Sequence, residues 1–133
     1  MVYLYDEIFL EHKTGAFHPE APDRLQAIQN CIQRQKFNNQ IDQITSKIAN
    51  ITDIQRVHST EYINLVEENC KNHYSELETG DTAICSRSFE VALHAVGGIL
   101  SAVDLLFAKK HKTAFCAVRP PGHHASTDQG MGF

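Results

Sequence analysis

The feature that most restricts the fold is a long amphipathic pattern followed directly by a short apolar run. Apolar residues recur at helical spacing from Phe89 to Phe107, which predicts a helix that begins at Ser86 or Ser88. A short turn then leads to residues 113–118, whose apolar run predicts a buried strand. Because a crossover helix that leads into a buried strand is typical of parallel pairing, the sequence predicts the α/β class.

Two adjacent glycines, Gly97 and Gly98, lie in the middle of this predicted helix. Each glycine destabilises an isolated helix by about 1 kcal/mol relative to alanine. That cost is tolerable where another element packs closely against the helix. We therefore expect a close backbone contact at this point.

The N-terminal part of the chain predicts a strand and then a helix. Residues 2–5 are β-branched and aromatic, as in a strand. Pro22 and Asp23 suit the first turn of a helix that continues to about Gln35. Glu20 and Asp23 are both expected near the positive end of that helix dipole.

The middle of the chain gives weaker patterns. Residues 38–50 fit either a strand or a loose helix, and the sequence does not choose between them. The other expectations are loops at 6–17 and 71–82, a short helix at 52–57, and a helix capped by Ser59 or Thr60.

The charge pattern argues against a nucleic-acid-binding protein. The net charge is −4, and the longest run of basic residues is the pair Lys109 and Lys110. The same mild acidity slightly favours a basic peptide or a polyamine as substrate.

Cysteine usage and hydropathy indicate a cytoplasmic protein without a membrane segment. The cysteines form no Cys-x-x-Cys pair, which argues against a zinc finger. Reduced thiols are favoured over disulfides. The N-terminus does not resemble a signal peptide, and no run approaches the roughly 18 apolar residues of a membrane span. The cysteines are Cys31, Cys70, Cys85 and Cys116.

Two adjacent histidines mark the candidate active site. His123 and His124 follow a stiff loop, Pro120–Gly122, which comes after Arg119 at the end of the predicted strand. Ligands of open α/β sheets bind outside the carboxyl ends of the strands. The loop is therefore expected to present both imidazoles to one cavity.

The histidine pair fits general acid–base chemistry. One ring can take a proton from water while the other, as a cation, assists the leaving group. Metal ligation is the competing interpretation, but it needs further ligands, and no His-x-x-x-His or Asp-x-His spacing is present. The plain alternative is a pair of surface histidines. His58 is better explained by packing, and no functional interpretation attaches to His12, His73, His94 or His111.

Several segments resemble the histone deacetylase family, in the broad sense that includes bacterial deacetylase-like proteins and acetylpolyamine amidohydrolases. The matches follow the family's order over nearly the whole chain. The sequence RPPGHHA is closer to that of class II and bacterial members than to that of other branches. The segments are HPEAPDRL at 18–25, VHSTEYI at 57–63, GDT at 80–82 with the helix that follows, RPPGHHA at 119–125 and GMGF at 130–133.

The resemblance implies the arginase/deacetylase fold, a three-layer α/β/α arrangement around a parallel sheet, here incomplete. It also implies zinc-dependent hydrolysis of an N-acetyl amide. His123 and His124 match the family's active-site histidines, one helping to activate the zinc-bound water and the other supporting proton transfer to the amine. Gly132 and Phe133 match the wall of the acyl-lysine channel.

Two further residues are carried over from the family. Asp81 matches the acid at the rim that holds the substrate backbone, and its alternative role is that of a turn residue beside Gly80. Arg24 matches the arginine of the internal cavity behind the site, and its alternative role is that of a cation on a helix surface.

The family's metal ligands have no counterpart in these residues. They are an Asp-x-His pair and a later Asp, all C-terminal to the matched motif, as is the carbonyl-polarising Tyr. Residues 1–133 are thus expected to be the N-terminal part of a single deacetylase-like domain, with zinc bound only in a longer parent enzyme. Alone, the chain is expected to lack activity and to bind no stoichiometric zinc.

Two hypotheses remain at this point. In the first, the chain is part of a zinc-dependent deacetylase that acts on an acetylated lysine peptide or an acetylpolyamine. In the second, it is a truncated, non-catalytic domain that acts in binding or self-association. Unpaired sheet edges favour a homo-oligomer under either hypothesis.

Overall fold

The computed structural model describes residues 1–35 and 40–132. Its elements in chain order are β1 (Val2–Leu4), the 3₁₀ helix η1 (Glu7–Glu11), α1 (Pro22–Arg34), β2 (Asp42–Ile44), α2 (Ile51–Ile54), α3 (Thr60–Lys71), α4 (Ser88–Phe107) and β3 (Ala114–Cys116). The strands form one parallel sheet in the order β2-β1-β3, in which Tyr3 lies opposite Gln43 and Phe115. The predicted α/β class is confirmed.

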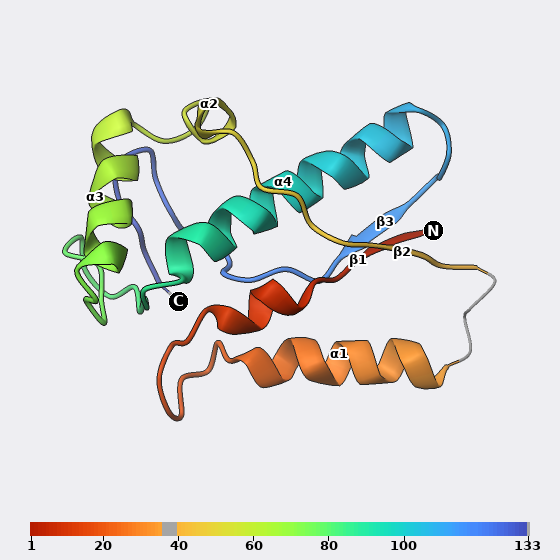
Figure 1. The fold of residues 1–133 in the computed structure, drawn as a ribbon, viewed down its shortest axis with the longest axis horizontal. Coiled ribbons are helices and arrows are strands. Elements are labelled where there is room, and N and C mark those ends of the chain that lie inside the picture. Colours follow the sequence, from red (N-terminus) through yellow and green to blue (C-terminus); the bar gives the residue numbers. More distant parts are fainter. Residues whose placement is uncertain (36–39, 133) are drawn as a thin grey trace.

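The central strand β1 is fully buried, and its side chains reach opposite faces of the sheet. The Tyr3 hydroxyl donates a hydrogen bond of 2.9 Å to Gln29 Oε1 on α1. The neighbouring Leu4 contacts α4 at Gly98. Because successive strand residues point to opposite faces, α1 and α4 cover the two sides of the sheet, as Figure 1 shows.

The close contact expected at the helix glycines is present. A Cβ atom at Gly97 would overlap the carbonyl oxygen of Lys47 and lie 2.7 Å from the amide nitrogen of Ala49. A Cβ atom at Gly98 would lie 2.7 Å from a terminal methyl group of Leu4. The two glycines therefore let α4 approach both β1 and the segment after β2.

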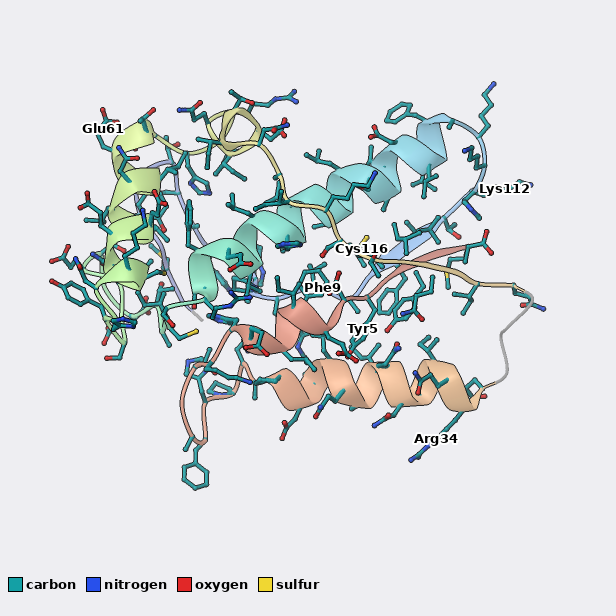
Figure 2. The ribbon with its side chains drawn as sticks, in the orientation of Figure 1. Tyr5, Phe9, Arg34, Glu61, Lys112 and Cys116 are labelled. Atoms are coloured by element: carbon teal, nitrogen blue, oxygen red, sulfur yellow. The ribbon has the colours of Figure 1, made fainter. Side chains whose placement is uncertain are left out.

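The core lies between β1, η1, α1 and α4. Figure 2 places Tyr5 and Phe9 inside it and Arg34, Glu61 and Lys112 at the surface. Its buried members are Tyr3, Leu4, Tyr5, Phe9, Leu25, Val91, Ala95 and Ala117.

Two expectations for the first half of the chain need correction or completion. Residues 6–17 are not all loop, because Asp6 Oδ1 accepts a hydrogen bond from the Ile8 amide and starts η1. Five residues are too few to show a helical period in the sequence. Within 38–50, the strand alternative is correct for Asp42–Ile44, while 38 and 39 lie outside the described residues.

The predicted buried strand at 113–118 is shorter and less buried than expected. β3 covers Ala114–Cys116, and 42% of the Phe115 side chain is exposed. In the described sheet, β3 lies at an edge, so no described strand pairs with its outer side.

The third helix begins where the sequence places it. The Ser59 hydroxyl accepts a hydrogen bond of 3.1 Å from the Tyr62 amide and caps α3. The short helix predicted at 52–57 is present but shorter, as α2 at Ile51–Ile54. The loop predicted at 71–82 begins one residue later, because Lys71 is still in α3, and its one short pairing is a bridge between Glu76 and Ala83 among the described residues.

By length and composition, the fourth helix is long and apolar enough to cross a membrane. This corrects the expectation that no segment approaches the length of an apolar membrane span. An 18-residue window in α4 has a mean hydropathy of 1.6. A core helix of a soluble protein has the same length and composition, and α4 packs against β1 and β3.

Candidate functional site

A cleft of about 620 Å³ opens where α3, α4 and the loop after β3 meet. Its walls are mainly apolar side chains of the two helices, such as Ile63 and Phe89. Concave sites with apolar walls and a few polar groups are the usual form of small-molecule sites. The polar or charged lining includes His12, Arg24, His58, Ser88 and His123.

The loop after β3 brings the two predicted histidines together. The ring centroids of His123 and His124 lie 4.2 Å apart, and the ring planes are inclined by 47°. His123 lines the cleft. His124 lies beside Gly132, at which a Cβ atom would be 3.5 Å from the His124 ring. Both imidazoles are exposed in this chain, so water and substrate can reach them.

The expected rim acid Asp81 and the expected channel residue Gly132 are in direct contact. Asp81 Oδ1 accepts a hydrogen bond of 2.9 Å from the Gly132 amide. The preceding Gly130 is buried, and a Cβ atom there would lie 2.7 Å from the Tyr62 hydroxyl. These contacts hold the segment 130–132 against α3 and the loop before α4. Phe133 lies outside the described residues.

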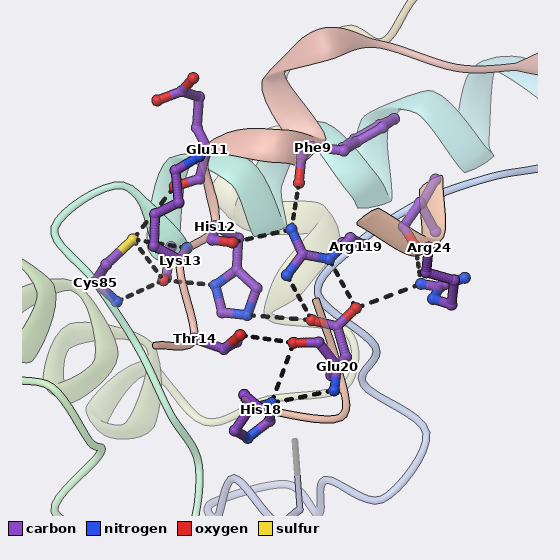
Figure 3. Close-up of polar contacts among 12 residues, drawn as sticks. Phe9, Glu11, His12, Lys13, Thr14, His18, Glu20, Arg24, Cys85 and Arg119 are labelled. Carbon is purple, nitrogen blue, oxygen red and sulfur yellow. Dashed lines mark hydrogen bonds and ion pairs between the residues drawn. The ribbon is translucent and has the colours of Figure 1, made fainter. Parts of the chain in front are cut away.

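Arg119, which precedes the histidine loop in the chain, forms a buried ion pair with Glu20 (Figure 3). Arg119 has no exposed surface, and it donates from Nε and one terminal nitrogen to the two carboxylate oxygens of Glu20, each at 2.7 Å. The other terminal nitrogen donates to the carbonyl oxygens of Phe9 and His12, at 2.8 and 2.9 Å. Burial alone would raise the pKa of Glu20, but Arg119 outweighs it and lowers that pKa.

A buried histidine packs beside this ion pair. His12 Nδ1 lies 2.7 Å from the Ser88 hydroxyl, and Nε2 lies 3.8 Å from Glu20 Oε2. Burial and, after it, the charge of Arg119 lower the pKa of His12 to about 4, although Glu20 partly opposes the shift. His12 is therefore neutral at neutral pH.

The predicted cavity residue Arg24 links the ion pair to the cleft. Its guanidinium donates to Glu20 Oε1 at 3.4 Å and to the Val118 carbonyl oxygen at 3.3 Å. Arg24 also lines the cleft that His123 lines, although 47% of its side chain is exposed.

Sequence reasoning missed the roles of Glu20, Arg119 and His12. Glu20 lies just before α1, near the positive end of the helix dipole as expected, but its carboxylate also turns inward to Arg119, which its place before Pro22 does not indicate. The sequence does contain a signal for Arg119, because an arginine directly after an apolar strand needs a partner for its charge. No pattern in the sequence shows which carboxylate that is.

Comparisons with known proteins show the family to which the chain belongs. Residues 18–133 match the family described as "Histone deacetylase domain". The chain belongs to the histone deacetylase family. Every motif that carried the resemblance lies in the matched region, and the structure places the motifs at 18–25 and 119–125 in direct contact through Glu20 and Arg119.

Relatives of this histone deacetylase family chain include prokaryotic proteins and a domain of solved structure. An uncharacterized protein of Synechocystis sp. is 36% identical over 98% of the chain and 43% of its own length. A "Probable deacetylase" of Archaeoglobus fulgidus is 30% identical over 98% of the chain and 36% of its own length. The crystal structure of the HDA15 HD domain superposes with a TM-score of 0.89 and 32% identity, covering all of this chain. That structure supports the arginase/deacetylase-like fold.

The chain spans less than half of these proteins, 40% in the case of the HDA15 HD domain. Within residues 1–35 and 40–132, no group of three or more His, Cys, Asp or Glu side chains is placed to hold a metal ion. A catalytic zinc site uses three protein ligands, so these residues alone do not fit one.

Proposed function

We propose that this chain supplies the proton-transferring histidines of a deacetylase that hydrolyses an N-acetyl amide. The observation that carries the proposal is the pair His123 and His124, side by side in the loop after β3 in a histone deacetylase family chain. Two imidazoles in one site can share the work, one taking a proton from water and one giving a proton to the leaving amine.

The cleft favours a substrate with an aliphatic chain. Its apolar walls suit the methylene groups of lysine or of a polyamine. The carboxylate of Asp81 beside Gly132 and the net charge of −4 favour a cationic substrate. We propose an acetylated lysine peptide or an acetylpolyamine, and Asp81, Gly132 and Phe133 as substrate-binding residues.

Zinc dependence belongs to the same proposal. A zinc ion bound by ligands outside these 133 residues would supply an activated water to the histidine pair. This chain's own contribution would be to hold and move the protons at the imidazole nitrogens of His123 and His124. Residues 1–133 then form the N-terminal part of one catalytic domain, and we place that protein in the cytoplasm.

The test is the release of acetate by the full product of the reading frame that contains these residues. We expect hydrolysis of an N-acetyl-lysine peptide or an N-acetylpolyamine, loss of activity after chelation, and recovery with added zinc. A product of full length that binds zinc and releases no acetate from either substrate would contradict the proposal.

A second candidate is a non-catalytic domain that self-associates. The observation that favours it is the outer edge of β3, which has no strand partner among the residues that the structure describes. Unpaired parallel edges readily accept another strand. A reading frame that ends at Phe133 would favour this candidate over the enzyme.

A further inference from the structure

The ion pair of Arg119 and Glu20 is more buried and makes more hydrogen bonds than an ordinary surface pair. Arg119 uses four hydrogen bonds of 2.7–2.9 Å, and its partner Glu20 is only 7% exposed. Paired, parallel hydrogen bonds between a guanidinium and a carboxylate fix direction as well as distance. The contacts join three segments distant in sequence: the end of η1, the entry to α1 and the end of β3.

We propose that Glu20 and Arg119 are positioning residues for the histidine pair. The inference rests on the proposed function, because orientation of the rings matters only if they transfer protons. Neither residue needs to touch the substrate. Their effect passes through the chain from Arg119 to His123.

The backbone between Arg119 and His123 is stiff, so the orientation of Arg119 affects the orientation of His123. Two of the three intervening residues are Pro120 and Pro121, whose rings fix φ and remove backbone freedom. The Ala125 amide donates to the Gly122 carbonyl oxygen at 3.1 Å and closes the turn that holds both histidines. Fixing Arg119 therefore fixes the direction in which the loop leaves β3.

A second tether acts on the residue before Arg119. Arg24 donates both to Glu20 Oε1 and to the Val118 carbonyl oxygen. It thereby connects the carboxylate of the pair to the last residues before the loop. Since Arg24 is half exposed, its removal leaves no buried charge without a partner.

The test measures the histidine rings directly, in the 133-residue chain. Long-range ¹H–¹⁵N spectra report the tautomer and surroundings of each imidazole, and they need neither metal nor substrate. The variants are Glu20→Gln and Arg119→Lys. The matched control is Arg87→Gln, which removes an exposed ion pair of 2.7 Å with Glu90.

We expect the ring signals of His123 and His124 to shift or broaden in both buried-pair variants, and the signals of His73 to stay in place. In Arg87→Gln, all ring signals should match those of the unchanged chain. Folded variants of Glu20 or Arg119 whose His123 and His124 signals coincide with the unchanged chain would overturn the proposal.

A milder variant protects the test against loss of folding. Arg24→Gln breaks the tether to Val118 without leaving a buried charge. We expect a smaller shift confined to the histidine loop, and unchanged His123 and His124 signals would count against the proposal. The ring signals are measured independently of activity. An inactive full-length product would therefore contradict the proposed function but not the positioning role of Glu20 and Arg119.

Discussion

The Nδ1 atom of His12 lies 2.7 Å from the hydroxyl oxygen of Ser88, at the buried start of α4. Four other groups face this imidazole or lie close enough to affect it. Glu20 Oε2 is 3.8 Å from Nε2 and raises the pKa of His12, whereas Arg119 and His18 lower it. Cys85 Sγ lies 3.4 Å from the Ser88 hydroxyl. His12 is thus neutral and buried beside the ion pair of Arg119 and Glu20.

The first prediction concerns acid stability. The pKa of His12 is about 4 in the folded chain and 6.5 in the unfolded chain. Between these values the unfolded chain binds a proton that the folded chain does not, so stability falls as pH falls from 6.5 to 4. The loss from this group is at most about 3 kcal/mol.

The measurement is urea unfolding between pH 8 and pH 4 for the unchanged chain and for His12→Asn. The variant should lose most of the slope between pH 6.5 and 4. Glu20 acts in a lower window, because its lowered pKa gives stability that is lost only below its ordinary value of 4.5. Equal slopes in the two chains above pH 4.5 would contradict the assignment to His12.

The second prediction concerns the glycines of α4. Gly97→Ala should destabilise the chain by about 3 kcal/mol or more, since the new methyl group meets the backbone of Lys47 and Ala49, which cannot move aside. Gly98→Ala should cost less, because it meets the movable end of the Leu4 side chain.

The matched control is Gly122→Ala, where no atom lies within 4 Å of the added methyl group. Its stability should stay within about 0.5 kcal/mol of the unchanged chain. Thermal unfolding followed by circular dichroism compares the three variants. A Gly98 variant less stable than the Gly97 variant would show that α4 crosses the sheet differently.

These cases show what the sequence could predict. The helical period of α4 followed by an apolar strand predicts the parallel sheet. The paired glycines of α4 predict the close contact with a neighbouring element. The family motif likewise predicts that His123 and His124 share one loop. Such features need only residues that are near one another in sequence.

The features that were missed depend on contacts between distant residues. Glu20 and Arg119 are separated by 99 positions, and a carboxylate near a helix start has an adequate local explanation. η1 begins with hydrogen bonds from the Ile8 and Phe9 amides to Asp6, which are too local to give a period. The exposure of Phe115 depends on the order of the strands, which no pattern within β3 encodes.

The third prediction concerns metal binding by the 133-residue chain. We expect equilibrium dialysis to show less than one zinc ion bound per chain, because the described residues bring no three suitable donors together. The same preparation should release no acetate from an N-acetyl-lysine peptide. One tightly bound zinc ion per chain together with acetate release would contradict this expectation.

The fourth prediction concerns self-association of the same chain. The outer edge of β3 and the exposed Phe115 are expected to make the molar mass rise with concentration in light scattering. Phe115→Lys should reduce this rise, whereas Phe17→Lys, at a fully exposed loop residue, should not. A constant monomer mass for the unchanged chain would rule out this interface.

The most direct test of the central claim is the rate of acetate release after each histidine is replaced. In the zinc-loaded product of the full reading frame, His123→Ala and His124→Ala should each lower kcat by about 10²–10⁴-fold. His73→Asn, at an exposed histidine with φ of 59°, should leave kcat unchanged. Full activity in both loop variants would contradict the account, because the paired imidazoles would then have no part in the proton transfers.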